Sequence, residues 1–111
     1  MSEKDKVTLL VPVDFSEHTT NSLPVAEYLA KIYDAEIHLL HVLEAPSGPM
    51  KLFSNFDVEE ARKKAIKMLE EVIQNGDGGI EYRKIVKVGR PYRKIQEAAV
   101  ELSCNDIVMG T

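Results

Sequence analysis

The chain has 111 residues, of which 44% are hydrophobic and 29% are charged, a balance typical of one globular domain. Its formal net charge of -4 argues against sequence-independent nucleic-acid binding, which needs a basic surface. No apolar stretch approaches the roughly 20 residues of a membrane helix, and the polar opening MSEKDK is unlike a signal peptide. The single cysteine cannot form an intramolecular disulfide. We therefore expect a cytoplasmic protein with neither nucleic acid nor membrane as a partner.

The first predicted element is a strand over residues 7–13, whose nearly unbroken apolar run is typical of a strand covered on both faces. It leads directly into Asp14, a carboxylate at the end of the strand where open α/β sheets bind ligands. A helix is predicted within 16–33, and Pro24 leaves two alternatives open. Either the helix kinks at the proline, or its regular part begins near Ser22 with the proline in the first turn. The residues expected to face the sheet are Ser22, Ala26, Leu29, Ala30 and Tyr33.

A second strand is predicted over 36–43, followed by a long surface loop over 44–56 with two prolines and a glycine. The loop is a candidate lid or binding loop. A capping-box spacing that begins at Asp57 starts the next helix, and the glycine-rich run NGDGG ends it. A third strand over 80–88 mixes charged and apolar residues, which is typical of an edge strand, because its lysines and arginine discourage edge-to-edge pairing.

The last predicted helix begins at Pro91, because proline is well tolerated in a first turn. A fourth strand follows over 107–109. The resulting βαβαβαβ order predicts a parallel sheet with right-handed crossovers and helices on both faces. We expect the strand order 3-2-1-4, which reverses direction between the first and fourth strands. The carboxyl ends of those two strands form the predicted binding crevice, with Asp14 on one side and Gly110 and Thr111 on the other.

Four segments, VPVDFS, LLHVLE, GRPYRKI and NDIVMGT, resemble the universal stress protein family in content, order and spacing, and the likeness covers essentially the whole chain. The resemblance implies a Rossmann-like fold of the adenine nucleotide alpha hydrolase-like group, with five parallel strands in the order 3-2-1-4-5. Many members of the family bind ATP and others do not. Against this pattern, residues 1–111 correspond to a single universal stress protein domain whose C-terminal part, including the fifth strand, is missing.

In ATP-binding members the phosphates are held by a motif of the form Gly-x2-Gly-x9-Gly-Ser/Thr. Gly110 matches its first glycine and Thr111 the next position, and the later glycines are not in this sequence. Cradling phosphates requires several backbone N–H groups, so we expect weak or absent ATP binding by residues 1–111. The fifth strand commonly makes the subunit contact in dimeric members, so the resemblance implies a homodimer for the full-length protein.

The resemblance places Asp14 in the adenosine pocket, where it would accept hydrogen bonds from ribose hydroxyls or from the adenine amino group. A carboxylate beside a triphosphate would favour a bound Mg²⁺. The alternative is that Asp14 only caps the following helix or forms a turn. The same resemblance makes Pro12 and Val13 one wall of an adenine slot and assigns the reading of the adenine edge to the backbone of Val42. The predicted nucleotide-binding residues are Pro12, Val13, Asp14, Val42, Met109, Gly110 and Thr111.

Motifs of catalysis are missing from the sequence: it has no Walker A motif, no Gly-x-Ser-x-Gly elbow and no convincing acid–base pair. We therefore predict no catalytic residues and at most slow ATP hydrolysis. His38 and His41 would lie on opposite faces of a strand and cannot share a metal ion, so no metal site is predicted. The expected function is that of a cytoplasmic stress-response regulatory protein that binds ATP or another adenine nucleotide. The alternative is a family member that does not bind nucleotide and acts as a dimeric protein-interaction module.

Overall fold

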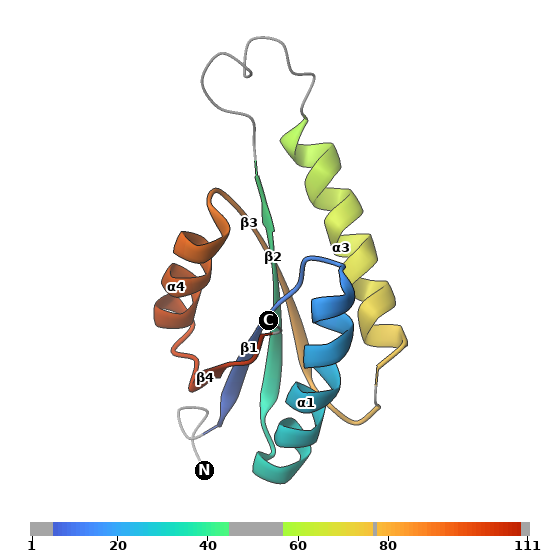
Figure 1. Cartoon of the computed structure of the whole chain (residues 1–111), viewed down its shortest axis with the longest axis vertical. Helices are drawn as coiled ribbons and strands as arrows, with labels where there is room; N and C mark the ends of the chain where they lie inside the picture. The colour runs from blue at the N-terminus through green and yellow to red at the C-terminus, as the bar shows by residue number, and fades with distance from the viewer. Residues whose placement is uncertain (1–5, 45–56, 77, 110–111) are drawn as a thin grey trace.

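The computed structural model describes residues 6–44, 57–76 and 78–109 (Figure 1). Strands and helices alternate along this part of the chain, as predicted. The elements are β1 (Thr8–Pro12), α1 (Glu17–Tyr33), β2 (Glu36–Leu43), α3 (Val58–Gln74), β3 (Tyr82–Val88), α4 (Pro91–Glu101) and β4 (Asp106–Ile107). The strands form one sheet in the order β3-β2-β1-β4, and every pair is parallel, which confirms the predicted topology. Among the helices of the described residues, none is both long enough and apolar enough to cross a membrane.

The two apolar strands, β1 and β2, lie at the centre of the sheet, and they pair from Thr8 opposite Glu36 to Pro12 opposite Leu40. The charged strand β3 pairs only with β2 in the described sheet, which confirms the predicted edge position. The last strand is shorter than expected: β4 contains two residues, although Val108 N–H still donates to the Leu10 carbonyl (2.9 Å). Met109, predicted to belong to this strand, lies just beyond it.

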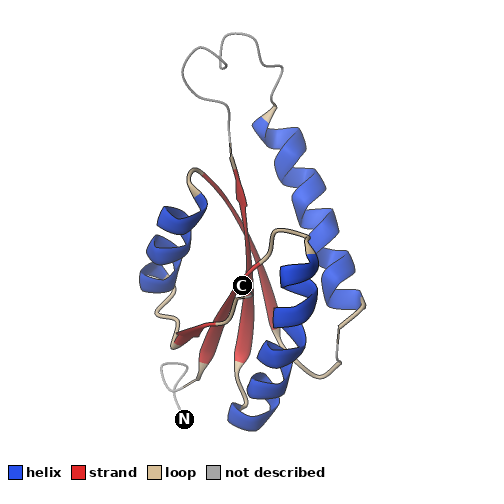
Figure 2. Cartoon of the chain, in the orientation of Figure 1, coloured by secondary structure: helices blue, strands red, loops and turns tan. Residues whose placement is uncertain are grey.

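Two apolar layers sandwich the sheet, with α1 and α3 on one face and α4 on the other (Figure 2). Because side chains alternate along a strand, Leu9, Val11 and Val13 pack into the core beneath α1 and α3. Leu10 instead faces α4. The smaller core under α4 joins buried residues of three elements, Leu10, Leu40, Ile95 and Ala98.

Helix α1 begins at Glu17 and keeps Pro24 in its interior, so the alternative of a helix starting near Ser22 is wrong. Pro24 is exposed, which leaves its ring on the solvent side of the helix. The expected inner face is largely correct, because Ser22, Ala26 and Ala30 are buried. The prediction that Tyr33 belongs to this inner face is wrong, since the residue is 60% exposed. It is the last helical residue and precedes Asp34, where a positive φ of 51° already turns the chain toward β2.

The starts of α3 and α4 follow the sequence signals. The Asp57 carboxylate accepts hydrogen bonds from the N–H groups of Glu59 (3.0 Å) and Glu60 (3.3 Å), which caps α3. Pro91 opens α4 after a turn at Gly89, whose φ of 150° is accessible mainly to glycine. This turn follows the carboxyl end of β3, so the first residues of α4 lie at the carboxyl edge of the sheet. The predicted loop over 44–56 falls outside the described residues, apart from Glu44.

Candidate functional site

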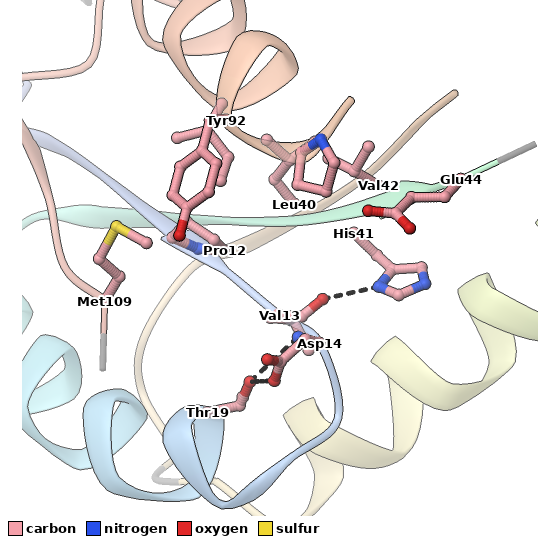
Figure 3. Close-up of a pocket in the computed structure, with 12 residues that line it drawn as sticks. Pro12, Val13, Asp14, Thr19, Leu40, His41, Val42, Glu44, Tyr92 and Met109 are labelled. Carbon is pink, nitrogen blue, oxygen red and sulfur yellow. Dashed lines mark hydrogen bonds between the residues drawn. The ribbon is translucent and has the colours of Figure 1, made fainter. Parts of the chain in front are cut away.

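A pocket of about 350 Å³ opens at the carboxyl edge of the sheet, where β1 leads into α1 and β3 leads into α4 (Figure 3). A volume of this size is at the lower end of the range for small-molecule sites, roughly 300–1,000 Å³. The described residues that line it are Pro12, Val13, Asp14, Thr19, Leu40, His41, Val42, Glu44, Pro91, Tyr92, Ile95 and Met109.

One half of the pocket is apolar because of strand alternation. Pro12 lies two residues after Leu10, and Val42 lies two residues after Leu40, so all four side chains belong to the face that α4 covers. Ile95 closes this half from the first turns of α4. The result is an apolar space between the end of the sheet and the beginning of α4, suited to a flat hydrophobic group.

The polar half is built around the Asp14 carboxylate at the start of α1. Asp14 Oδ1 accepts hydrogen bonds from Ser16 N–H (2.9 Å), from the Ser16 hydroxyl and from the Thr19 hydroxyl (3.0 Å). The Thr19 oxygen in turn accepts the backbone N–H of Asp14 (3.1 Å). These donors, the Ser16 hydroxyl and N–H foremost, hold the pKa of Asp14 below its usual value, so the group is ionised at neutral pH.

The second carboxylate oxygen of Asp14 is differently placed. In the described part of the chain no hydrogen bond reaches Oδ2, and the side chain is exposed at the pocket. One oxygen therefore organises the start of α1, while the other can accept a hydrogen bond from a ligand. The helix-start interpretation and the ligand interpretation of Asp14 are geometrically compatible, because they use different oxygens.

His41 is held in one tautomer by its neighbours. Its Nδ1 lies 2.6 Å from the backbone carbonyl of Val13, and its ring packs against Phe15 with centroids 4.6 Å apart. A carbonyl oxygen can only accept, so Nδ1 carries the proton and donates it to this bond. In the neutral ring Nε2 is then an acceptor. Phe15 has a positive φ of 63°, the conformation through which the chain leaves β1 and separates from β2.

Within the described residues, this arrangement leaves the backbone N–H and C=O of Val42 without a partner on the β1 side. The Leu40 carbonyl accepts Val13 N–H (2.7 Å), so Leu40 directs its backbone groups toward β1, and Val42, two residues later, does the same. The next acceptor in that ladder would be the Val13 carbonyl, which is bound to His41 instead. Across the described residues, neither Val42 N–H nor Val42 C=O has a partner on the β1 side. Val42 thus offers one donor and one acceptor side by side at the pocket.

The structure brings five of the seven predicted site residues, Pro12, Val13, Asp14, Val42 and Met109, together around this pocket. The other two, Gly110 and Thr111, lie outside the described residues. The sequence reasoning missed the contributions of α4, of Thr19 on α1 and of the residues at the end of β2. For Thr19, the only signal in the sequence was its position five residues after Asp14, within the predicted helix. The residues missed were Thr19, Leu40, His41, Glu44, Pro91, Tyr92 and Ile95.

The two histidines of β2, His38 and His41, have different surroundings. His38 is buried on the α4 face of the sheet, whereas His41 contacts Val13 and Phe15 at the pocket. Burial lowers the pKa of His38, and the Glu36 carboxylate 3.3 Å from its Nε2 partly opposes this effect. Within residues 6–44, 57–76 and 78–109, no group of three or more potential ligands could hold a metal ion.

A parallel sheet with a ligand-sized pocket at its switch point defines an open, doubly wound α/β protein. The chain belongs to the universal stress protein family, whose sequence model matches residues 8–111. A search of curated proteins found no significant match.

Solved structures of the same family resemble this chain. A universal stress protein from Archaeoglobus fulgidus DSM 4304 is 25% identical, with a TM-score of 0.63 over 93% of this chain. The match spans only 32% of that longer protein. A family protein from Burkholderia pseudomallei is 20% identical, with a TM-score of 0.69 over 99% of this chain and 85% of its own. A universal stress protein in complex with cAMP is 16% identical, with a TM-score of 0.63 over 95% of this chain and 76% of its own. The last two likenesses establish the shared fold.

Proposed function

We propose that this chain binds the adenosine part of an adenine nucleotide in the pocket and acts as a regulatory protein in a stress response. The observation that carries the proposal concerns the backbone of Val42 at the edge of an apolar space: among the described residues, its N–H and C=O have no partner on the β1 side. The Watson–Crick edge of adenine presents a ring nitrogen that accepts and an amino group that donates. A backbone N–H beside a backbone C=O is complementary to that pair.

The rest of the pocket suits the same ligand. Asp14 Oδ2 can accept from a ribose hydroxyl, and Pro12 and Met109 offer apolar contact to the base. Further support comes from the family relative whose structure contains cAMP, an adenine nucleotide. We assign Gly110 and Thr111 to the beginning of the phosphate contact, as the family motif implies.

Charge at the pocket limits how phosphates can be bound. Of its described lining residues, Asp14 and Glu44 are carboxylates and none is lysine or arginine. A triphosphate placed there is repelled unless a cation such as Mg²⁺ accompanies it. We therefore expect adenosine, AMP and cAMP to bind at least as well as ATP. The proposal assigns no catalytic residue. It also includes a cytoplasmic location and a homodimer.

Isothermal titration calorimetry of the 111-residue chain tests the proposal, with adenosine as ligand and inosine as the matched control. Inosine presents a donor and an acceptor in reversed order on the same purine frame, so the Val42 backbone rejects it. At about 0.3 kcal/mol per non-hydrogen atom, adenosine with about 19 such atoms gains roughly 6 kcal/mol, which corresponds to a Kd of tens of micromolar. We expect one saturable site for adenosine and at least about tenfold weaker binding of inosine. Absence of saturation at millimolar adenosine would refute the proposal.

A second function, a protein-interaction module, is favoured by the outer face of α1. Val25, Tyr28 and Ile32 are 52%, 66% and 55% exposed and lie three and four residues apart, so they share one face of the helix. An apolar stripe of this kind is typical of a contact surface. If adenosine fails to bind while the protein forms a dimer that the substitution Tyr28→Glu dissociates, this second function replaces the first. Multi-angle light scattering of both proteins distinguishes the outcomes.

A further inference from the structure

Tyr92 is an aromatic side chain at the mouth of the pocket whose ring is mostly in contact with solvent. It lines the pocket although the residue is 77% exposed. Figure 3 shows the ring reaching from α4 toward Pro12 and Met109. The exposed face of the Tyr92 ring can therefore form apolar contacts with a ligand bound in the pocket.

The direction of the Tyr92 side chain follows from its place in α4. Helical Cα–Cβ bonds tilt toward the helix N-terminus, and the N-terminus of α4 lies at the carboxyl edge of the sheet. A residue in the first turn therefore projects over that edge. Its backbone is held firmly, because Pro91 precedes it at the start of the helix and the buried Ile95 anchors the next turn.

Exposure alone does not distinguish Tyr92 from other tyrosines of the chain. Tyr28 and Tyr33 are 66% and 60% exposed, but both lie on α1 and neither lines the pocket. What sets Tyr92 apart is that it lines the pocket together with Pro12, at the end of β1. Tyr92 belongs to α4 and Pro12 to β1, so the two residues line the pocket from different elements.

We propose that Tyr92 stacks on the base of the bound nucleotide and closes the pocket over it, which makes it a specificity-determining residue for ligands with a large aromatic base. This inference rests on the proposed function and deepens it. The Val42 backbone reads the edge of the base, whereas Tyr92 covers its face. Stacking is tolerant of base identity, so Tyr92 contributes affinity for purines in general, and discrimination between purines stays with Val42.

The test measures adenosine affinity by calorimetry for the wild type and three variants. Loss of one base–aromatic stack weakens binding by about 5- to 150-fold, so Tyr92→Ala raises the Kd of adenosine by that factor. Tyr92→Phe keeps the ring and leaves the Kd within about twofold. The control Tyr28→Ala removes another exposed tyrosine, which lies outside the pocket, and leaves the Kd unchanged. Because Tyr92 is exposed, its variants retain the thermal midpoint of the wild type.

Tyr92→Trp adds an independent readout, because the chain contains no tryptophan. The emission of this single reporter shifts when adenosine is added, whereas that of Tyr28→Trp does not. If the wild type binds adenosine and Tyr92→Ala binds it equally well, the stacking inference is wrong while the proposed function stands. If neither protein binds adenosine and the Tyr92→Trp emission is unchanged, both are wrong.

Discussion

Asp14→Asn separates the two roles of the Asp14 carboxylate, and its effect can be worked out from the hydrogen bonds at the start of α1. Asparagine keeps one acceptor oxygen, which the donors of Ser16 and Thr19 orient toward the helix. In place of Oδ2 it presents an NH₂ group, a donor, to the pocket. The hydrogen bonds to Ser16 and Thr19 at the start of α1 are retained, so the free energy of unfolding should fall by less than about 1 kcal/mol.

Ligand binding should respond much more strongly to the same change. A hydrogen bond from a ribose hydroxyl to a charged carboxylate contributes about 1.5–3 kcal/mol, and Asp14→Asn replaces the acceptor with a donor. The expected loss of adenosine affinity is therefore about 10- to 150-fold. Asp14→Ala removes both oxygens, so it should lose the same affinity and also about 1–2 kcal/mol of stability, or roughly 4–8 °C in Tm for a domain of this size.

Calorimetry gives the affinities and thermal unfolding followed by circular dichroism gives the stabilities. Three proteins suffice: the wild type, Asp14→Asn and Asp14→Ala. The reasoning is refuted if Asp14→Asn binds adenosine as the wild type does, because Oδ2 then contacts no ligand. It is equally refuted if Asp14→Asn loses as much stability as Asp14→Ala, since the asparagine oxygen would then fail to replace Oδ1.

Three further predictions concern other residues. His41→Phe releases the carbonyl that His41 now binds and lets it pair with Val42 N–H, so the preference for adenosine over inosine should fall about tenfold; an unchanged preference in calorimetry contradicts this. Burial keeps the pKa of His38 below its unfolded value of about 6.5, so its contribution to stability is present above that pH and is lost as the pH falls through the folded pKa. Urea unfolding at about pH 7.5 and 5.5 should show this loss in the wild type and a smaller loss in His38→Leu, and equal losses would count against it. Gly89→Ala places a side chain at a φ of 150° and should cost about 1–3 kcal/mol in thermal unfolding, whereas a neutral substitution would show that the turn adapts.

The fold was largely predictable because it depends on patterns that are local in sequence. Apolar runs identified β1 and β2, and the charged residues of β3 placed it at the edge. The bounds of β2 matched the prediction fully. Errors fell where tertiary context outweighs local preference. Pro24 remains inside α1, Tyr33 leaves the inner face at the end of that helix, and β4 is short because only two of its residues pair with β1.

The candidate site was predictable only in part, for a physical reason. Residues that follow β1, such as Asp14, could be placed at the carboxyl edge from the topology alone. Tyr92 could not be placed there from the topology. Its position depends on where the connection from β3 positions the first turn of α4 relative to the sheet. The role of His41 depends on one hydrogen bond to a carbonyl that is 28 residues away in the chain. No pattern in the sequence reveals which backbone groups of Val42 that bond leaves unpaired.

The central claim is that the backbone of Val42 reads the edge of an adenine base, and the amide resonance of Val42 tests it most directly. In a ¹⁵N-labelled sample titrated with adenosine, the N–H of Val42 gains an acceptor, so its proton resonance should move downfield and its exchange with solvent should slow. Inosine at the same concentration should leave it unchanged. The account would be contradicted if the amide resonance of Val42 did not shift while adenosine shifted other resonances, such as those of residues on the outer face of α1.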